Sequence, residues 1–224
     1  MSLETLLFEQ KQVKVIDASI DYHHYVFVDL SAENTTALKI NLTDARLFEN
    51  YIEDYLKFNL SKVAFGGYLE KRNLYKRSEV FNLSHLPERN IHLGLDLWIK
   101  ADTNVLAALD GTIHSFQDNS ALGDYGPTII LEHQLFGYKF YTLYGHLSLE
   151  SLNDLTIGQA FKGGETLAQL GAAPINGDYA PHLHFQIIKD LQGKQGDYPG
   201  VCAAADLDFY KQNFPDPNLL LKIK

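Results

Sequence analysis

Apolar and polar residues alternate early in the chain and then change their period. Residues 13–17 (VKVID) and 25–30 (YVFVDL) read as half-buried strands. From residue 44 to residue 60 apolar residues recur every three to four positions, which predicts an amphipathic helix with Thr43 as its N-cap. We interpret the apolar stripe of this helix as a face packed on the core, not as a docking surface.

Beyond about residue 78 short apolar runs rich in Ile, Leu, Phe and Tyr are separated by turn-forming pairs, such as Asp-Gly at 110–111 and Gly-Gly at 163–164. Many short strands with a turn about every 8 to 12 residues are typical of antiparallel sheets. We therefore predict a mainly β protein (α+β overall) with an antiparallel, sandwich-like core. Its expected parts are an N-terminal α/β segment packed on the core (1–78), the β domain (79–200) and a C-terminal helical or loop tail (201–224).

The composition is that of a globular protein and narrows the choice of partners. The 224 residues are 46% hydrophobic and 21% charged, with a net charge of -9. An acidic chain is not expected to bind nucleic acid, and anionic lipid or wall polymer would repel it. The single cysteine, Cys202, excludes an intramolecular disulfide and a structural zinc cluster built on thiolates.

Two further patterns bear on location. The longest apolar stretches fall short of the ~20 residues that a membrane span requires. The first residues, MSLETLLFEQKQ, lack the basic and then apolar regions of a secretory signal. We expect a cytoplasmic protein from the chain as printed, and a periplasmic or extracellular one if a leader precedes residue 1.

Five polar side chains stand out as candidate chemistry: His92 and Asp96 in IHLGLDLW, His146 in YGHLS, and His182 and His184 in APHLHF. They offer two imidazoles and a carboxylate to a zinc ion and leave two imidazoles to move protons. Three protein ligands with an open fourth position define a catalytic zinc site. The group therefore predicts a zinc hydrolase.

The spacing of these residues suits strands. An extended strand would separate the Cα atoms of His92 and Asp96 by ~13 Å, so we expect Gly94 between them to supply a bend. His182 and His184 are two apart and point to the same side of a strand, with Cα atoms ~7 Å apart. One of the two can hold zinc while the other stands over the attacking water.

Taken in order, the motifs H-x-x-x-D, Y-x-H-L-S and P-H-L-H-F resemble those of the lysostaphin-type (LytM-type) zinc metallo-endopeptidase family. Members of that family hydrolyse peptide bonds, usually glycyl bonds in bacterial cell-wall cross-links. The resemblance covers about residues 89–188 and implies a duplicated-hybrid-motif-like β fold with one zinc ion per chain. It implies that the zinc ligands are His92, Asp96 and His184, and that the catalytic pair is His146 and His182.

The remaining histidines fall outside the implied site. His133 lies at a position where members of the family often have a histidine that does not bind metal. The others, which match no motif position, are His23, His24, His85 and His114. Tyr144 is a conceivable extra hydrogen-bond donor, but we interpret it as a packed strand tyrosine.

A second, narrower resemblance concerns RNLYKRSEVF, HLGLDLW, DYGPTIILEH, NGDYAPHLHFQII, DYPGV and PDPNLLL. These segments are similar to the peptidase-like domain of cytosolic fusion proteins, where it lies between a kinase-like phosphotransferase domain and a pyridoxal-phosphate aminotransferase domain. Such a relative would meet no peptidoglycan. The loop APINGDYAPHLHF also replaces the Gly- and Ser-rich approach usual in the peptidase family, which makes substrate preference the least defined feature.

We therefore expect a zinc-dependent metallo-endopeptidase-like hydrolase that cleaves peptide or amide bonds, with glycyl, peptidoglycan-type bonds as one option. The alternatives are an intracellular zinc amidase acting on a small metabolite and a non-catalytic binding or regulatory module that retains the fold. Because the chain has no His-Glu-x-x-His segment, the general base must be His146 or His182. The complete set of five residues favours an enzyme, since inactive relatives usually lack one or more of them.

Overall fold

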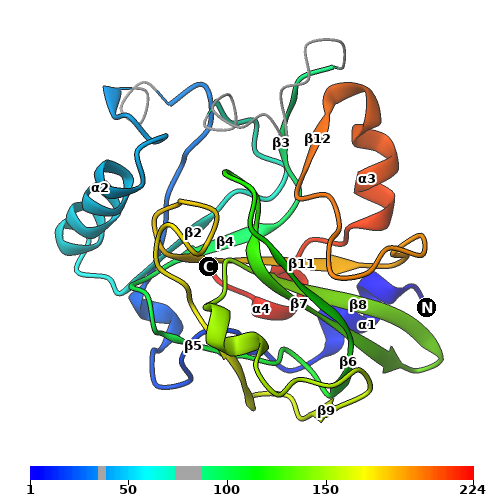
Figure 1. Cartoon of the computed structure of the whole chain (residues 1–224). Coiled ribbons are helices and arrows are strands. Elements are labelled where there is room, and N and C mark those ends of the chain that lie inside the picture. Colours follow the sequence, from blue (N-terminus) through cyan, green and yellow to red (C-terminus); the bar gives the residue numbers. More distant parts are fainter. Residues whose placement is uncertain (35–38, 74–86) are drawn as a thin grey trace.

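An eight-stranded sheet is the framework of the computed structural model (Figure 1), which describes residues 1–34, 39–73 and 87–224. The strand order is β1-β2-β4-β11-β8-β7-β6-β9. The strands are β1 (Tyr25–Phe27), β2 (Val63–Gly66), β4 (Leu95–Trp98), β6 (Gly111–Asn119), β7 (Gly126–Leu135), β8 (Tyr138–Gly145), β9 (Ala160–Phe161) and β11 (His182–Ile188). All neighbouring strands are antiparallel except β1 and β2, which are parallel.

Two small sheets complete the β structure of the described residues. One pairs β5 (Asn104–Leu106) with β10 (Thr166–Gln169), and the other pairs β3 (Arg89–His92) with β12 (Val201–Ala203). The prediction of a mainly β, antiparallel fold is therefore confirmed. Cys202, on β12, is buried and unpaired.

The centre of the large sheet is buried on both faces. Every residue of β4 and of β11 is buried, so the polar side chains on these strands lie inside the protein. Apolar residues of β11, such as Leu183 and Phe185, belong to the main core cluster. A buried polar group needs a partner, which makes the polar residues of these two strands the natural place to look for a site.

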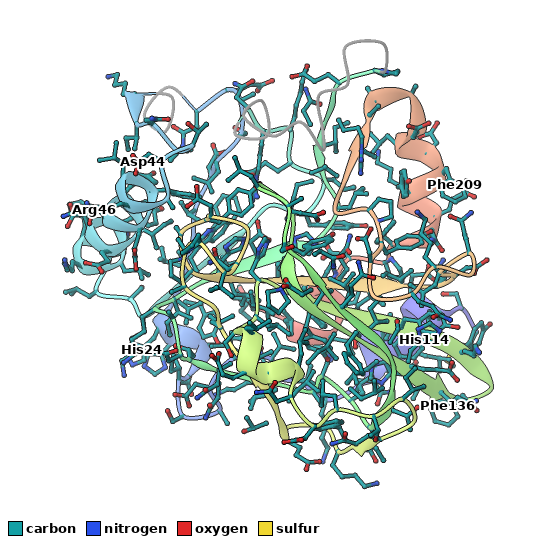
Figure 2. All side chains as sticks on the ribbon, in the orientation of Figure 1. His24, Asp44, Arg46, His114, Phe136 and Phe209 are labelled. Carbon is teal, nitrogen blue, oxygen red and sulfur yellow. The ribbon has the colours of Figure 1, made fainter. Side chains whose placement is uncertain are left out.

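The predicted amphipathic helix is α2 (Ala45–Phe58), and its apolar face packs on the sheet as expected. Phe48 and Ile52 share a buried cluster with Trp98 of β4. The N-cap prediction is wrong by one residue: the Asp44 carboxylate accepts from the Leu47 N–H at 2.9 Å (Asp44 is labelled in Figure 2). The Thr43 hydroxyl instead donates to the side-chain oxygen of Asn41, so Thr43 does not cap the helix.

The N-terminal segment differs from its sequence pattern. Residues 13–17 form no strand, and Ile16 makes only an isolated bridge to Val105. A helix that the sequence analysis did not predict, α1 (Leu3–Glu9), precedes them, with Ser2 as its cap. Strands β1 and β2 extend the large sheet beyond β4, so this segment is continuous with the β framework.

The C-terminal tail contains the helices α3 (Leu207–Asn213) and α4 (Asn218–Leu221). Leu220 and Leu221 share the main core with Leu3 and Leu7, so the two ends of the chain pack together. Short helical turns in the described parts of the chain include Tyr22–His24, Leu149–Leu152 and Ala204–Asp206. The predicted boundary near residue 78 lies outside the described residues, and no helix within the described ranges is long and apolar enough to cross a membrane.

Candidate metal centre and active site

Strand pairing brings the five candidate residues to one place. His184 lies in register with Asp96 on one side and with Gly145 on the other, so His146 follows at the end of β8. His92 ends β3, and the chain turns between β3 and β4 at Leu93 and Gly94. The bend that the His92–Asp96 spacing required is therefore present.

Three ligand atoms form a small buried triangle. His92 Nε2 lies 2.9 Å from His184 Nδ1 and 3.2 Å from Asp96 Oδ1, and His184 Nδ1 lies 3.0 Å from the same oxygen. Tetrahedral zinc ligands at 2.0–2.1 Å from the ion are roughly 3.3 Å apart. Two imidazoles and a carboxylate at this separation fit a zinc ion, and no other group of three such side chains is found in the described parts of the chain.

Two glycines make room for the imidazole rings. A Cβ atom on Gly94 would lie 2.6 Å from His184 Nε2 and Cε1. A Cβ atom on Gly67 would lie 2.8 Å from His92 Nδ1, and the φ of +103° at Gly67 also favours glycine. Gly94 therefore does more than allow the predicted bend: it also lets the backbone lie close to the His184 ring.

Hydrogen bonds orient the three candidate ligands. His92 Nδ1 donates to the Gly67 carbonyl at 2.8 Å, which leaves Nε2 for a metal ion. His184 Nε2 lies 3.4 Å from the Tyr125 hydroxyl. Asp96 Oδ2 accepts from Arg72 Nη1 at 2.6 Å. Sequence reasoning assigned no role to Gly67, Arg72 or Tyr125.

The other two histidines are anchored through the same ring atom. Nδ1 of His146 lies 2.7 Å from the Asn176 carbonyl, and Nδ1 of His182 lies 2.7 Å from the Ala180 carbonyl. A carbonyl oxygen only accepts, so both Nδ1 atoms carry the proton, and both Nε2 atoms keep a lone pair in the neutral ring. The ring centroids of His146 and His182 are 4.1 Å apart. The pair can therefore act on the same reacting group.

Burial sets the protonation state of the site. It lowers the pKa of His182 and of His184 to about 4 and the pKa of His146 well below its ordinary value. Burial opposes ionisation of Asp96, but His92 and Arg72 beside it hold the pKa of this carboxyl well below its usual range. Neutral imidazoles and an ionised carboxylate are the forms that bind metal.

The site opens into a pocket with a cavity of about 160 Å³. Its wall includes Phe48 from α2, Tyr179, and residues 197–201 before and at the start of β12. Tyr144 is not part of this wall: its buried hydroxyl accepts from the Ala108 N–H at 2.9 Å. The interpretation of Tyr144 as a packed tyrosine is confirmed.

The remaining histidines lie elsewhere. His133 is buried between the Asp110 carbonyl and the Thr142 hydroxyl. Two others also lie outside the group and are labelled in Figure 2: His24, whose ring is tilted against that of His23, and His114, which is hydrogen-bonded to the Ser115 hydroxyl. His85 lies outside the described residues.

Fold and site together define a β-sheet domain with a buried three-residue group fit to hold a metal ion. Residues 90–197 match the profile of peptidase family M23. All five candidate residues fall within the match. The expected resemblance to the lysostaphin-type peptidase family is confirmed by this match, whereas the narrower resemblance to fusion proteins stays a prediction.

Solved structures with a similar fold include the catalytic domain of lysostaphin from Staphylococcus simulans, at 24% identity over 55% of this chain and 80% of that chain, with a TM-score of 0.38. A mutant catalytic domain of the prophage-encoded M23 protein EnpA from Enterococcus faecalis is 20% identical over 51% of this chain and 79% of that chain, with a TM-score of 0.38. A chain of the SpoIIIAH–SpoIIQ complex is 22% identical over 66% of this chain and 92% of that chain, with a TM-score of 0.41. No curated protein matches the chain.

Proposed function

We propose that the chain is a zinc-dependent hydrolase of peptide or amide bonds. The observation that carries the proposal is a buried ligand triangle with two Nδ1-anchored imidazoles beside it in one pocket. In the proposed site His92, Asp96 and His184 hold one zinc ion. When bound, zinc would lower the pKa of a water molecule and polarise the amide carbonyl.

His146 and His182 are the proposed proton carriers. A neutral imidazole with a free Nε2 can take a proton from the attacking water and later give it to the leaving amine. The hydrogen bonds from Nδ1 to the Asn176 and Ala180 carbonyls fix the tautomer that this role needs. The close approach of the two rings allows one to accept a proton while the other, as a donor, stabilises negative charge on the carbonyl oxygen.

One observation favours a short or small substrate. The cavity of about 160 Å³ is small, since ligand pockets usually measure about 300–1,000 Å³. Phe48 and Tyr179 line it. A small amide or a peptide end is therefore a candidate substrate beside the glycyl peptide that the family suggests. The cytoplasmic location expected from the sequence stays a prediction.

Metal analysis and turnover of two variants test the proposal. We expect one zinc ion per wild-type chain, little zinc in Asp96→Ala, and full zinc with at least ~100-fold lower turnover in His146→Ala, which loses a proton carrier but no ligand. Turnover is measured on a panel of glycine-containing peptides and small primary and secondary amides. Full zinc stoichiometry without Asp96 would contradict the ligand assignment. Zinc-loaded wild type that hydrolyses nothing on the panel would favour a binding module.

A further inference from the structure

A buried arginine from outside the family-matched residues contacts the candidate metal centre. Arg72 is 2% exposed, and its Nη1 donates to Asp96 Oδ2 at 2.6 Å. Its Nε donates to Glu70 Oε2 at 2.5 Å. The guanidinium therefore joins two carboxylates inside the protein, and such charge-assisted bonds are among the stronger ones in proteins.

The two oxygens of Asp96 have different partners. Oδ2 accepts from Arg72, whereas Oδ1 lies 3.2 Å from His92 Nε2 and 3.0 Å from His184 Nδ1. A carboxylate free to rotate can bind a metal ion through one or both oxygens. Here the guanidinium occupies one oxygen and directs the other to the ligand triangle.

We propose that Arg72 is a positioning residue that holds Asp96 as a one-oxygen metal ligand, with Glu70 as its brace; this rests on the metal site proposed above. Outer partners of ligating carboxylates and histidines fix their orientation and tune the metal. Residues 67–72 are then part of the metal centre, although the family match begins at residue 90.

The surroundings of Arg72 leave the guanidinium little freedom. Its Cζ lies 5.4 Å from the Trp98 ring centroid, a cation–π contact. A Cβ atom on Gly67 would lie 2.1 Å from Arg72 Nη2, so a larger residue there would displace it. The brace is itself anchored, because Glu70 Oε1 accepts from the Leu30 N–H at 3.0 Å.

Charge and position predict opposite effects when Arg72 is replaced. A positive guanidinium beside a divalent cation repels it, so electrostatics alone predicts that Arg72→Gln binds zinc more tightly. Positioning predicts weaker binding, by about 10–100-fold, the usual effect of losing an outer partner. With the Asp96 carboxyl ionised in every variant, the direction of the change therefore distinguishes the two.

The experiment measures zinc affinity by competition with a chromophoric chelator for wild type, Arg72→Gln, Arg72→Lys and Glu70→Gln. We expect about 10–100-fold weaker binding for Arg72→Gln, an intermediate loss for Arg72→Lys, and a smaller one for Glu70→Gln. The matched control is Arg46→Gln, at an exposed position of α2 (Figure 2), and should match wild type.

Cobalt(II) substitution supplies a readout that a general loss of stability would not change. Four-coordinate cobalt absorbs visible light more strongly than five- or six-coordinate cobalt. If Asp96 turns to bind through both oxygens, the absorption of Arg72→Gln should weaken relative to wild type at saturating cobalt.

Unchanged or tighter zinc binding in folded Arg72→Gln, with the wild-type cobalt spectrum, would overturn the inference. If circular dichroism shows that both Arg72 variants are unfolded, Glu70→Gln decides: weaker zinc binding supports the inference and wild-type affinity overturns it. Wild type that binds no zinc would instead overturn the proposed function on which the inference rests.

Discussion

Replacing Gly94 with alanine tests the metal centre with a single methyl group. The added Cβ would lie 2.6 Å from His184 Nε2 and Cε1, about 0.8 Å short of the 3.4 Å of ordinary contact. It would also lie 2.9 Å from the Phe185 carbonyl oxygen. His184 is 2% exposed, so its ring has little space into which to retreat. We expect the ring or the β3–β4 turn to move by several tenths of an ångström.

The expected magnitude follows from the tolerance of the site. Metal–ligand distances in a competent site vary by only about ±0.2 Å, so a shift of this size should greatly weaken the bond between His184 and the zinc ion. We expect zinc affinity to fall by about 10–100-fold, which corresponds to about 1.4–2.7 kcal/mol. In the metal-free protein the same methyl should cost about 1–3 kcal/mol of unfolding free energy, as overpacking usually does.

Zinc competition titrations and urea unfolding with and without zinc measure both effects. The matched control is Gly163→Ala, because a Cβ atom there would meet its nearest neighbour, the Leu109 Cα, at 3.3 Å, and Gly163 lies outside the pocket. The control should bind zinc as wild type does. Wild-type zinc affinity in folded Gly94→Ala would refute the assignment of His184 as a ligand packed against this turn.

Two further predictions concern stability. Burial lowers the pKa of His133 to about 4, so the unfolded chain takes up this proton at a higher pH than the folded protein does. The contribution of neutral His133 to stability is full above about pH 6.5, and about 3 kcal/mol of it is lost towards pH 4. Urea unfolding of His133→Gln should show a shallower loss over this range, and an equal slope would exclude His133 as the cause. Removing zinc with a chelator should lower the melting temperature of wild type, because zinc at 100 times its Kd stabilises by about 2.7 kcal/mol. Calorimetry of Asp96→Ala, which should show no such shift, is the control, and an equal shift in both would contradict the ligand set.

The strands and the group of five candidate residues could be predicted because both depend on local spacing, whereas the choice of three ligands among the five came from the family resemblance. Alternation in LGLDLWI identifies β4, short apolar runs identify β8 and β11, and His-x-His on one strand places two imidazoles on one face whatever surrounds it. The bend at Gly94 followed from the distance between His92 and Asp96 alone. The geometry of the triangle then came from strand register, which pairs Asp96 directly with His184.

Errors of prediction arose where short segments depend on their neighbours. Helix α1 has only seven residues, too few for its spacing of Leu3, Leu6 and Leu7 to stand out, and packing on the core holds it. Residues 13–17 alternate like a strand, yet only Ile16 finds a partner strand. The cap of α2 differed by one residue because Thr43 and Asp44 are both good caps and the Asn41 side chain takes the threonine hydroxyl.

Arg72 shows why the support of a site is harder to predict than its ligands. In the sequence it is one of several basic residues in KRNLYKR, and nothing local separates it from a solvated surface arginine. It becomes a buried partner of Asp96 only because β2 pairs with β4 and the Arg72 N–H donates to the carbonyl of Asn90 in β3. Asp96 thus contacts both parts of the chain: Oδ1 lies beside His92 and His184 of the family motif, and Oδ2 accepts a hydrogen bond from Arg72 of the N-terminal segment. A motif defines which atoms can hold a metal ion. The orientation of the Asp96 carboxylate, however, is set by Arg72, which lies outside the motif.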